Sequence, residues 1–169
     1  MTILAVTKNC NLYDKAARIL RERFCCKGQT DIDFSRPKPA FAGTYCGMYD
    51  FNISHSGKLA AIAVSDKTVG CDIEELKGRA HRAVMDRLTS RERAGLESEE
   101  DFLRNWTAKE AFIKMHGFSI ATHLKRLEYF DGGIWLDETK QPCTITHLVS
   151  PSCVIAVCGE EGVTCTTEI

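Results

Sequence analysis

A long helix is the sequence feature that most constrains the fold of this chain. Residues 98–117, SEEDFLRNWTAKEAFIKMHG, start with a potential cap at Ser98, have acidic residues in the first turn and end at Gly117, all of which favour a helix. Leu103, Trp106, Glu110 and Ile113 recur three and four residues apart, and the apolar residues among them form one stripe along the helix. Such a stripe must be buried, and we expect this helix to pack on a sheet.

Strand patterns before and after this helix supply the sheet. We expect strands at residues 2–7, 49–56, 58–65, 68–74, 125–130, 133–138, 143–149 and 153–159. Two more helices are expected, an amphipathic one over residues 12–24 and a short one after Thr89, where Glu92 completes a capping-box pattern. Helices combined with runs of antiparallel strands predict an α+β fold.

Charge and cysteine usage narrow the class of protein. The 22 basic and 23 acidic side chains leave a formal net charge of -1, which favours neither nucleic acid nor an anionic membrane as a partner. The nine cysteines include no C-x-x-C pair, so we interpret them as reduced thiols rather than zinc ligands. No apolar run is long enough for a signal peptide or a membrane span, and we expect a cytoplasmic protein.

Two acidic residues stand close together in the strand VGCDIE, residues 69–74. Because strand side chains alternate between faces, Asp72 and Glu74 share one face, and Cys71 and Ile73 share the other. Two like charges this close repel each other, so either solvent screens them or a cation lies between them.

A third carboxylate, Glu110, lies within the apolar stripe of the long helix, one turn before Lys114. Taken alone, it could form an ordinary surface pair with Lys114, and Asp72 and Glu74 could mark an exposed strand end. A helix packed on the sheet would instead bring three carboxylates together. Oxygen ligands in a site with few protein donors favour Mg²⁺.

The segment FNISHS, residues 51–56, is the best candidate for binding phosphate. Asn52, Ser54 and Ser56 share one strand face, and His55 stands near the turn, although His55 could also be an ordinary strand-end histidine. The chain has no G-x-x-x-x-G-K-[ST], G-x-G-x-x-G or G-x-S-x-G motif. Metal-assisted attack on a phosphate by an outside nucleophile therefore remains open.

These residues together give the chain a family resemblance. The sequence resembles the 4′-phosphopantetheinyl transferase superfamily, specifically the larger class typified by the surfactin-synthetase-activating enzyme. FNISHS at 51–56, VGCDIE at 69–74 and WTAKEAFIK at 106–114 match in order, with a looser Lys-Pro at 38–39 upstream. The resemblance covers about residues 36–117.

The resemblance implies an enzyme that transfers phosphopantetheine from coenzyme A to a serine of an acyl or peptidyl carrier protein. Mg²⁺ would bridge the pyrophosphate, and adenosine 3′,5′-bisphosphate would be released. By motif match, the metal ligands would be Asp72, Glu74 and Glu110, and the coenzyme A phosphates would be bound by Lys38, Ser54, His55 and Lys114. Lys114 would contact the pyrophosphate, and Glu110, Glu74 or metal-bound water would take the serine proton.

The family fold implies two similar α+β halves related by a pseudo-twofold axis, with coenzyme A between them. We place the halves at residues 1–66 and 67–169, and a monomer would suffice. The first half is shorter than in typical relatives and lacks their basic N-terminal segment, for which Arg18, Arg21 or Arg36 could substitute.

Residues 77–93 are rich in Lys and Arg, and Val84, Met85 and Leu88 could form an apolar face there. This stretch could bind the acidic helix of a carrier protein, or its apolar residues could simply face the core. Two other functions stay open, a non-catalytic module that binds a carrier protein or coenzyme A, and a magnesium-dependent nucleotide hydrolase.

Overall fold

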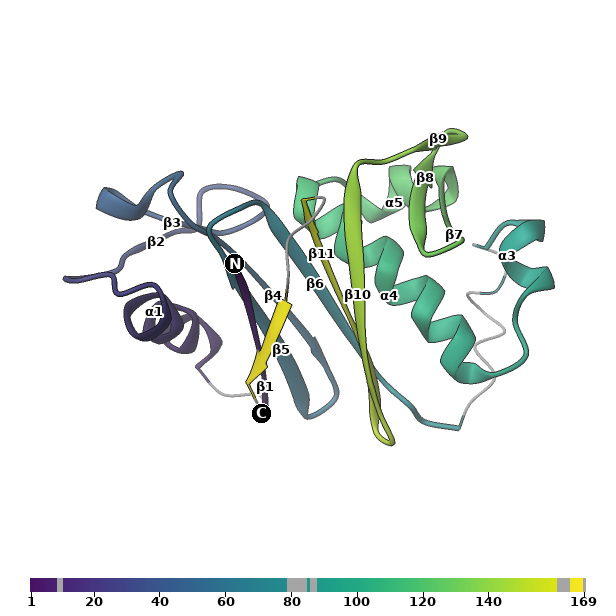
Figure 1. Cartoon of the computed structure of the whole chain (residues 1–169), viewed down its shortest axis with the longest axis horizontal. Coiled ribbons are helices and arrows are strands. Elements are labelled where there is room, and N and C mark those ends of the chain that lie inside the picture. Colours follow the sequence, from purple (N-terminus) through teal and green to yellow (C-terminus); the bar gives the residue numbers. More distant parts are fainter. Residues whose placement is uncertain (9–10, 79–84, 86–87, 161–164, 169) are drawn as a thin grey trace.

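A computed structural model describes residues 1–8, 11–78, 85, 88–160 and 165–168. The main elements form four layers (Figure 1): helix α1 (Leu12–Arg23), a first sheet, a second sheet and helix α4 (Glu99–His116). Each helix packs on the outer face of one sheet, and the inner faces of the two sheets pack against each other. Helices combined with mainly antiparallel strands confirm the predicted α+β class.

The first sheet contains the N-terminal strands. Its strand order is β12 (Cys165–Glu168), β1 (Thr2–Lys8), β5 (Leu59–Ser65) and β4 (Asp50–Ser56). β4 and β5 form the predicted hairpin, β1 is antiparallel to β5, and β12 runs parallel to β1. Asn11 caps α1, which buries Ala16, Ile19 and Leu20 against the outer face of this sheet. The predicted first strand, first helix and hairpin are confirmed.

The second sheet carries the acidic strand. Its order is β10 (Cys143–Ser150), β11 (Cys153–Glu160) and β6 (Val69–Glu75), all antiparallel. α4 is capped by Ser98 and ends at Gly117, whose φ of 65° is left-handed, as the sequence predicted. Thr89 and Glu92 form the expected capping box of α3 (Ser90–Ala94).

The remaining elements are short. They are β2 (Ile32–Asp33), β3 (Ala40–Phe41), the 3-10 helices η1 (Gly43–Tyr45) and η2 (Leu124–Arg126), α5 (Ile120–His123), β7 (Leu127–Phe130), β8 (Gly133–Leu136) and β9 (Thr139–Lys140). β7, β8 and β9 form a separate antiparallel sheet, and Leu127 and Ile134 bury it against α4.

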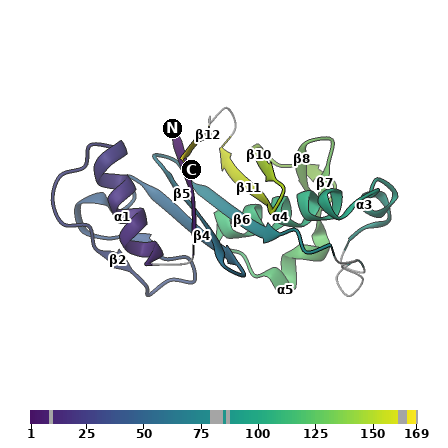
Figure 2. The ribbon, with the colours of Figure 1, turned by 90° about the horizontal axis from the view of Figure 1, so that it is seen from below.

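The two main sheets also meet along a polar seam between β4 and β6, which lie side by side (Figure 2). β6 is an edge strand of its own sheet, and side chains of β4 satisfy its free amides. Asp50 accepts a hydrogen bond from the amide of Val69 at 2.9 Å, and Asn52 accepts one from the amide of Cys71 at 2.9 Å. The division at residue 66 and the pseudo-twofold axis stay predictions, and β12 pairs with the N-terminal sheet.

Candidate active site

The acidic strand presents its carboxylates to α4, as the strand period predicted. Cys71 and Ile73 are buried between the sheets, whereas Asp72 lies on the opposite face, next to Lys114 of α4. Gly70 makes this approach possible, because a Cβ atom there would lie only 2.0 Å from the carbonyl oxygen of Ala111. The helix backbone therefore rests directly on the strand backbone.

Asp72 is the centre of the site and is 2% exposed. Its Oδ1 accepts hydrogen bonds from Lys114 Nζ at 2.6 Å and Ser54 Oγ at 2.7 Å. Its Oδ2 is buried and has no hydrogen-bond partner among the described residues. An orphaned carboxylate oxygen of this kind calls for a further donor or cation.

The pKa shifts in this pair have opposing causes. Burial of Asp72 raises the pKa of its carboxyl group more than Lys114 and Ser54 lower it. Burial acts to lower the pKa of the Lys114 ammonium, but the attraction of Asp72, with a smaller contribution from Glu110, raises it overall. Lys114 thus compensates only part of the free-energy cost of burying the Asp72 carboxylate. This agrees with the absence of a partner for Oδ2 of Asp72 among the described residues.

The other two predicted metal ligands lie nearby. Glu74 is partly buried, which raises the pKa of its carboxyl group, and its Oε2 accepts a hydrogen bond from Ser56 Oγ at 2.7 Å. Glu110 is 13% exposed, and its Oε2 is 3.9 Å from Lys114 Nζ. The ammonium of Lys114 therefore links Asp72 to Glu110.

The donor set can be tested against a metal ion on its chemistry. Among the described residues, no three His, Cys, Asp or Glu side chains are grouped closely enough to hold a metal. The donors Asp72, Glu74 and Glu110 nevertheless offer only oxygen, and Oδ2 of Asp72 is buried and unpartnered. These properties fit a hard divalent cation, whose charge would complement that of the three carboxylates.

A cavity of about 320 Å³ adjoins this cluster. Its polar lining includes Lys38, His55 and Lys114, and aromatic walls come from Tyr13 of α1 and Phe118 after α4. His55 is exposed. The structure therefore gathers three of the predicted phosphate-binding residues at one cavity, while Ser54 bonds to Asp72 and Lys114.

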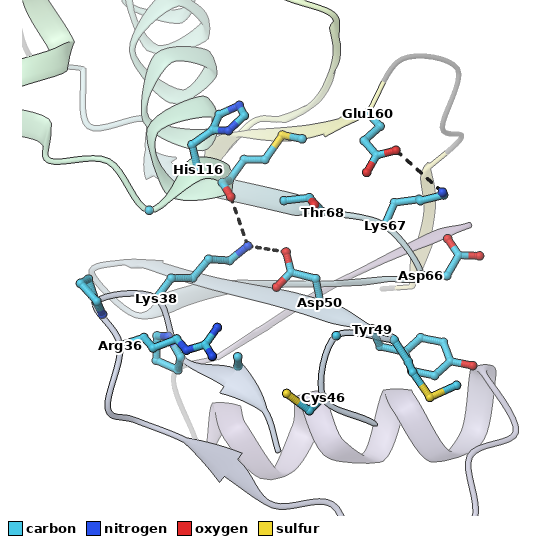
Figure 3. A pocket seen from close by; sticks show the side chains of 17 residues that line it. Arg36, Lys38, Cys46, Tyr49, Asp50, Asp66, Lys67, Thr68, His116 and Glu160 are labelled. Atoms are coloured by element: carbon cyan, nitrogen blue, oxygen red, sulfur yellow. Dashed lines mark hydrogen bonds and ion pairs between the residues drawn. The ribbon is translucent and has the colours of Figure 1, made fainter. Parts of the chain in front are cut away.

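Lys38 has hydrogen-bond partners in both main sheets and at the end of α4. Its ammonium donates hydrogen bonds to Asp50 and to the carbonyl oxygens of Val69 at 2.7 Å and Met115 at 3.5 Å. Figure 3 shows the contact between Lys38 and Asp50 at the wall of a larger cavity, of about 690 Å³, which Arg36 also lines. Lys38 thus ties the loop before β3 to β4, β6 and the end of α4, and its contact with a ligand stays a prediction.

A buried ion pair lies behind the site and was not foreseen from the sequence. Nζ of Lys109 lies 3.1 Å from both carboxylate oxygens of Glu92, and both side chains are 0% exposed. Glu92 also accepts hydrogen bonds from the amides of Thr89 and Tyr129, so it joins α3, α4 and β7. The sequence contains one indication that Lys109 is buried. It follows the buried Phe102 by seven residues, or about two helical turns, and so lies on the same face of α4.

The stretch at residues 77–93, for which carrier-protein binding and core packing were both left open, lies partly outside the described residues, and Val84 is among those not described. Leu88 is buried, and Met85 packs against the same cluster with Phe102 and Leu103. These two side chains face the core, which agrees with the alternative interpretation. Within the described part of the chain, no helix is both long and apolar enough to cross a membrane.

Comparison of the sequence with known proteins identifies its family. The family model described as the 4′-phosphopantetheinyl transferase superfamily matches residues 68–158, which include β6 and all of α4. The chain therefore belongs to this superfamily, and the resemblance seen in the sequence is confirmed.

Individual relatives support this assignment. The chain is 32% identical over 123 residues to the 4′-phosphopantetheinyl transferase psf-1 of Bacillus pumilus, covering 65% of this chain and 52% of that protein. It is 38% identical over 114 residues to the 4′-phosphopantetheinyl transferase AcpT of Salmonella typhi, covering 62% and 58%. It is 32% identical over 121 residues to the 4′-phosphopantetheinyl transferase Sfp of Bacillus subtilis strain 168, covering 64% and 54%. These alignments span little more than half the length of the relatives.

Proposed function

We propose that this chain transfers the 4′-phosphopantetheine group from coenzyme A to a serine of an acyl or peptidyl carrier protein, with Mg²⁺ as cofactor. The observation that carries the proposal is the cluster of Asp72, Lys114 and Ser54 at the edge of a cavity that His55 also lines. Membership of the superfamily adds the reaction class to this geometry.

The proposed reaction exchanges one phosphorus–oxygen bond for another. The serine oxygen forms a bond to the β-phosphorus of coenzyme A, and the bond from that phosphorus to the bridging oxygen breaks. Adenosine 3′,5′-bisphosphate leaves with the electron pair. Glu110 takes the serine proton, with Glu74 as the alternative acceptor, because both carboxylates lie beside the cluster.

The chain's own residues would stabilise charge and hold the substrate. Asp72, Glu74 and Glu110 would hold Mg²⁺, which supplies charge neutralisation on the pyrophosphate when bound. Lys114, already at the centre of the cluster, would bind a pyrophosphate oxygen, and His55 and Lys38 would contact other phosphates of coenzyme A. No covalent enzyme intermediate is required.

The proposal includes a monomer in the cytoplasm whose partners are coenzyme A and a carrier protein, without nucleic acid or membrane. The near-neutral formal net charge of -1 favours neither nucleic acid nor an anionic membrane as a partner. The free thiols of the described cysteines, such as buried Cys71 and Cys158, suit a reducing compartment.

Intact mass spectrometry of an apo carrier protein tests this function. After incubation with this protein, coenzyme A and Mg²⁺, we expect a mass gain of one phosphopantetheine, lost with a chelator and with Glu110→Gln. Glu100→Gln is the matched control, because Glu100 lies on the same helix, its side chain is 42% exposed, and it pairs with Arg104. Coenzyme A binding without any mass gain on several carrier proteins would refute the transferase and indicate a non-catalytic binding module. Release of nucleotide without a carrier protein would indicate a hydrolase.

A further inference from the structure

We infer that Ser56, together with Ser54, is a positioning residue that orients the carboxylates of the proposed metal site. The inference rests on the proposed function and deepens it. Ser54 and Ser56 lie two residues apart on β4, and Asp72 and Glu74 lie two residues apart on β6. Each serine hydroxyl is 2.7 Å from one oxygen of the carboxylate opposite it, so the two strands form a two-step ladder.

The direction of these hydrogen bonds is fixed by a second set of contacts. Ser54 Oγ also accepts a hydrogen bond from Lys114 Nζ at 2.8 Å, and Ser56 Oγ accepts one from the amide of Glu75 at 3.1 Å. An ammonium and a backbone amide can only donate, so the hydroxyl hydrogen of each serine is left to point at its carboxylate. Both serines therefore donate to the acids.

The ladder leaves one oxygen of each carboxylate outside these serine contacts. Ser54 bonds to Oδ1 of Asp72 and leaves Oδ2, which is buried and unpartnered among the described residues. Ser56 bonds to Oε2 of Glu74, which restricts a side chain that has three rotatable bonds and is only partly buried. Hydrogen bonds from outside the ligand shell orient metal ligands in this way, and losing one typically costs about 10–100-fold in metal affinity.

Other residues of the seam make contacts of a different kind. The Asn52 side chain accepts a hydrogen bond from the amide of Cys71, and the Asp50 side chain accepts one from the amide of Val69. These contacts join the sheets without touching either acid. Along β4, some side chains therefore bond to backbone amides of β6 and others to its carboxylates. Ser56 is the sharper test, because the family resemblance assigns a phosphate contact to Ser54 and not to Ser56.

Binding of Mn²⁺, followed by electron paramagnetic resonance at saturating coenzyme A, tests the inference without using activity. We expect Ser56→Ala to weaken Mn²⁺ binding by about 10-fold or more. Ser56→Thr, which keeps the hydroxyl, should restore binding. Ser65→Ala is the matched control, because it removes a buried serine hydroxyl of the same sheet that contacts Thr2 and Met1 but neither carboxylate, and its Mn²⁺ affinity should match the wild type. Unfolding by urea, measured for every variant, shows how much stability each loses.

The outcomes separate this inference from the proposed function. Equal Mn²⁺ affinity for Ser56→Ala and the wild type, in an active transferase, would overturn the role of Ser56 and leave the function intact. A wild type that neither binds Mn²⁺ nor modifies a carrier protein would overturn both. Should Ser56→Ala not fold, Ser56→Cys replaces it, since a thiol is a much weaker donor of similar size and should still weaken Mn²⁺ binding.

Discussion

Replacing Gly70 by alanine should test whether direct contact between α4 and β6 builds the site. A Cβ atom at position 70 would lie 2.0 Å from the carbonyl oxygen of Ala111 and 2.5 Å from the amide nitrogen of Met115. Both are backbone atoms of α4, so no side-chain rotation can relieve the overlap. The helix must move away from the strand.

The size of the movement follows from ordinary contact distances. Cβ atoms essentially never approach other heavy atoms within 3.0 Å, so α4 must shift by at least about 1 Å at this point. Overpacking of this kind costs roughly 1–3 kcal/mol, or a fall in Tm of about 2–12 °C for a domain of this size. The shift also pulls Lys114 from Asp72, now 2.6 Å apart. A misplacement of about 1 Å can reduce a rate by about 10²-fold.

Circular dichroism gives the Tm, and the carrier-protein assay, run well below that temperature, gives the rate. Gly95→Ala is the matched control: Gly95 ends α3 with a φ of −97°, and a Cβ atom there would meet only the carbonyl oxygen of Glu92, at 3.8 Å. We expect Gly95→Ala to resemble the wild type. If Gly70→Ala has the same Tm and the same transfer rate as Gly95→Ala, the close approach of helix and strand does not hold the site together.

Two further predictions concern stability. Lys109→Met should lower the free energy of unfolding, measured in urea, by about 3–5 kcal/mol, because it leaves the buried carboxylate of Glu92 without its cation. The double variant with Glu92→Leu should lose less stability. A loss below about 1 kcal/mol in the single variant would show that the pair is not buried. Burial lowers the pKa of His147 to about 4 from 6.5, although its hydrogen bond to the Arg104 carbonyl opposes the shift. The unfolded chain therefore binds the proton first as pH falls, so stability should be complete above pH 6.5 and decrease toward pH 4 by up to about 3 kcal/mol. Urea unfolding at several pH values should show a flatter profile for His147→Asn, and equal profiles would contradict the assignment.

The sequence predicted the elements of the fold better than their assembly. The spacing of Leu12, Ala16, Ile19 and Leu20 identified α1, and capping residues placed both ends of α4. Residues 165–168 are a short polar segment with no alternating pattern, so their pairing with β1 was missed. That pairing joins opposite ends of the chain, and local periodicity contains no information about it.

In the site, too, local arrangement was predicted and contacts between elements were not. The strand period was enough to put Asp72 and Glu74 on one face, because side chains alternate in any strand. The expected partner of Lys114 was Glu110, one turn away, yet the shorter contact of Lys114 is with Asp72, at 2.6 Å against 3.9 Å. Spacing within a helix gives local neighbours only, and the closer partner depended on how α4 packs on β6. The pair of Lys109 with Glu92 was not predicted, because the two residues are 17 positions apart in the sequence and meet only where α3 and α4 come together.

The polar seam changes how variants in the family motifs must be interpreted. Asn52, Ser54 and Ser56 share a face, as the sequence indicated, but that face meets β6 and bonds to its amides and carboxylates. Lys38 likewise donates to Asp50 and to two backbone carbonyls. Loss of activity on changing any of these residues is therefore expected whether or not they touch coenzyme A. A ligand contact is identified only where the KM for coenzyme A rises while the free energy of unfolding is unchanged, because a seam residue changes both.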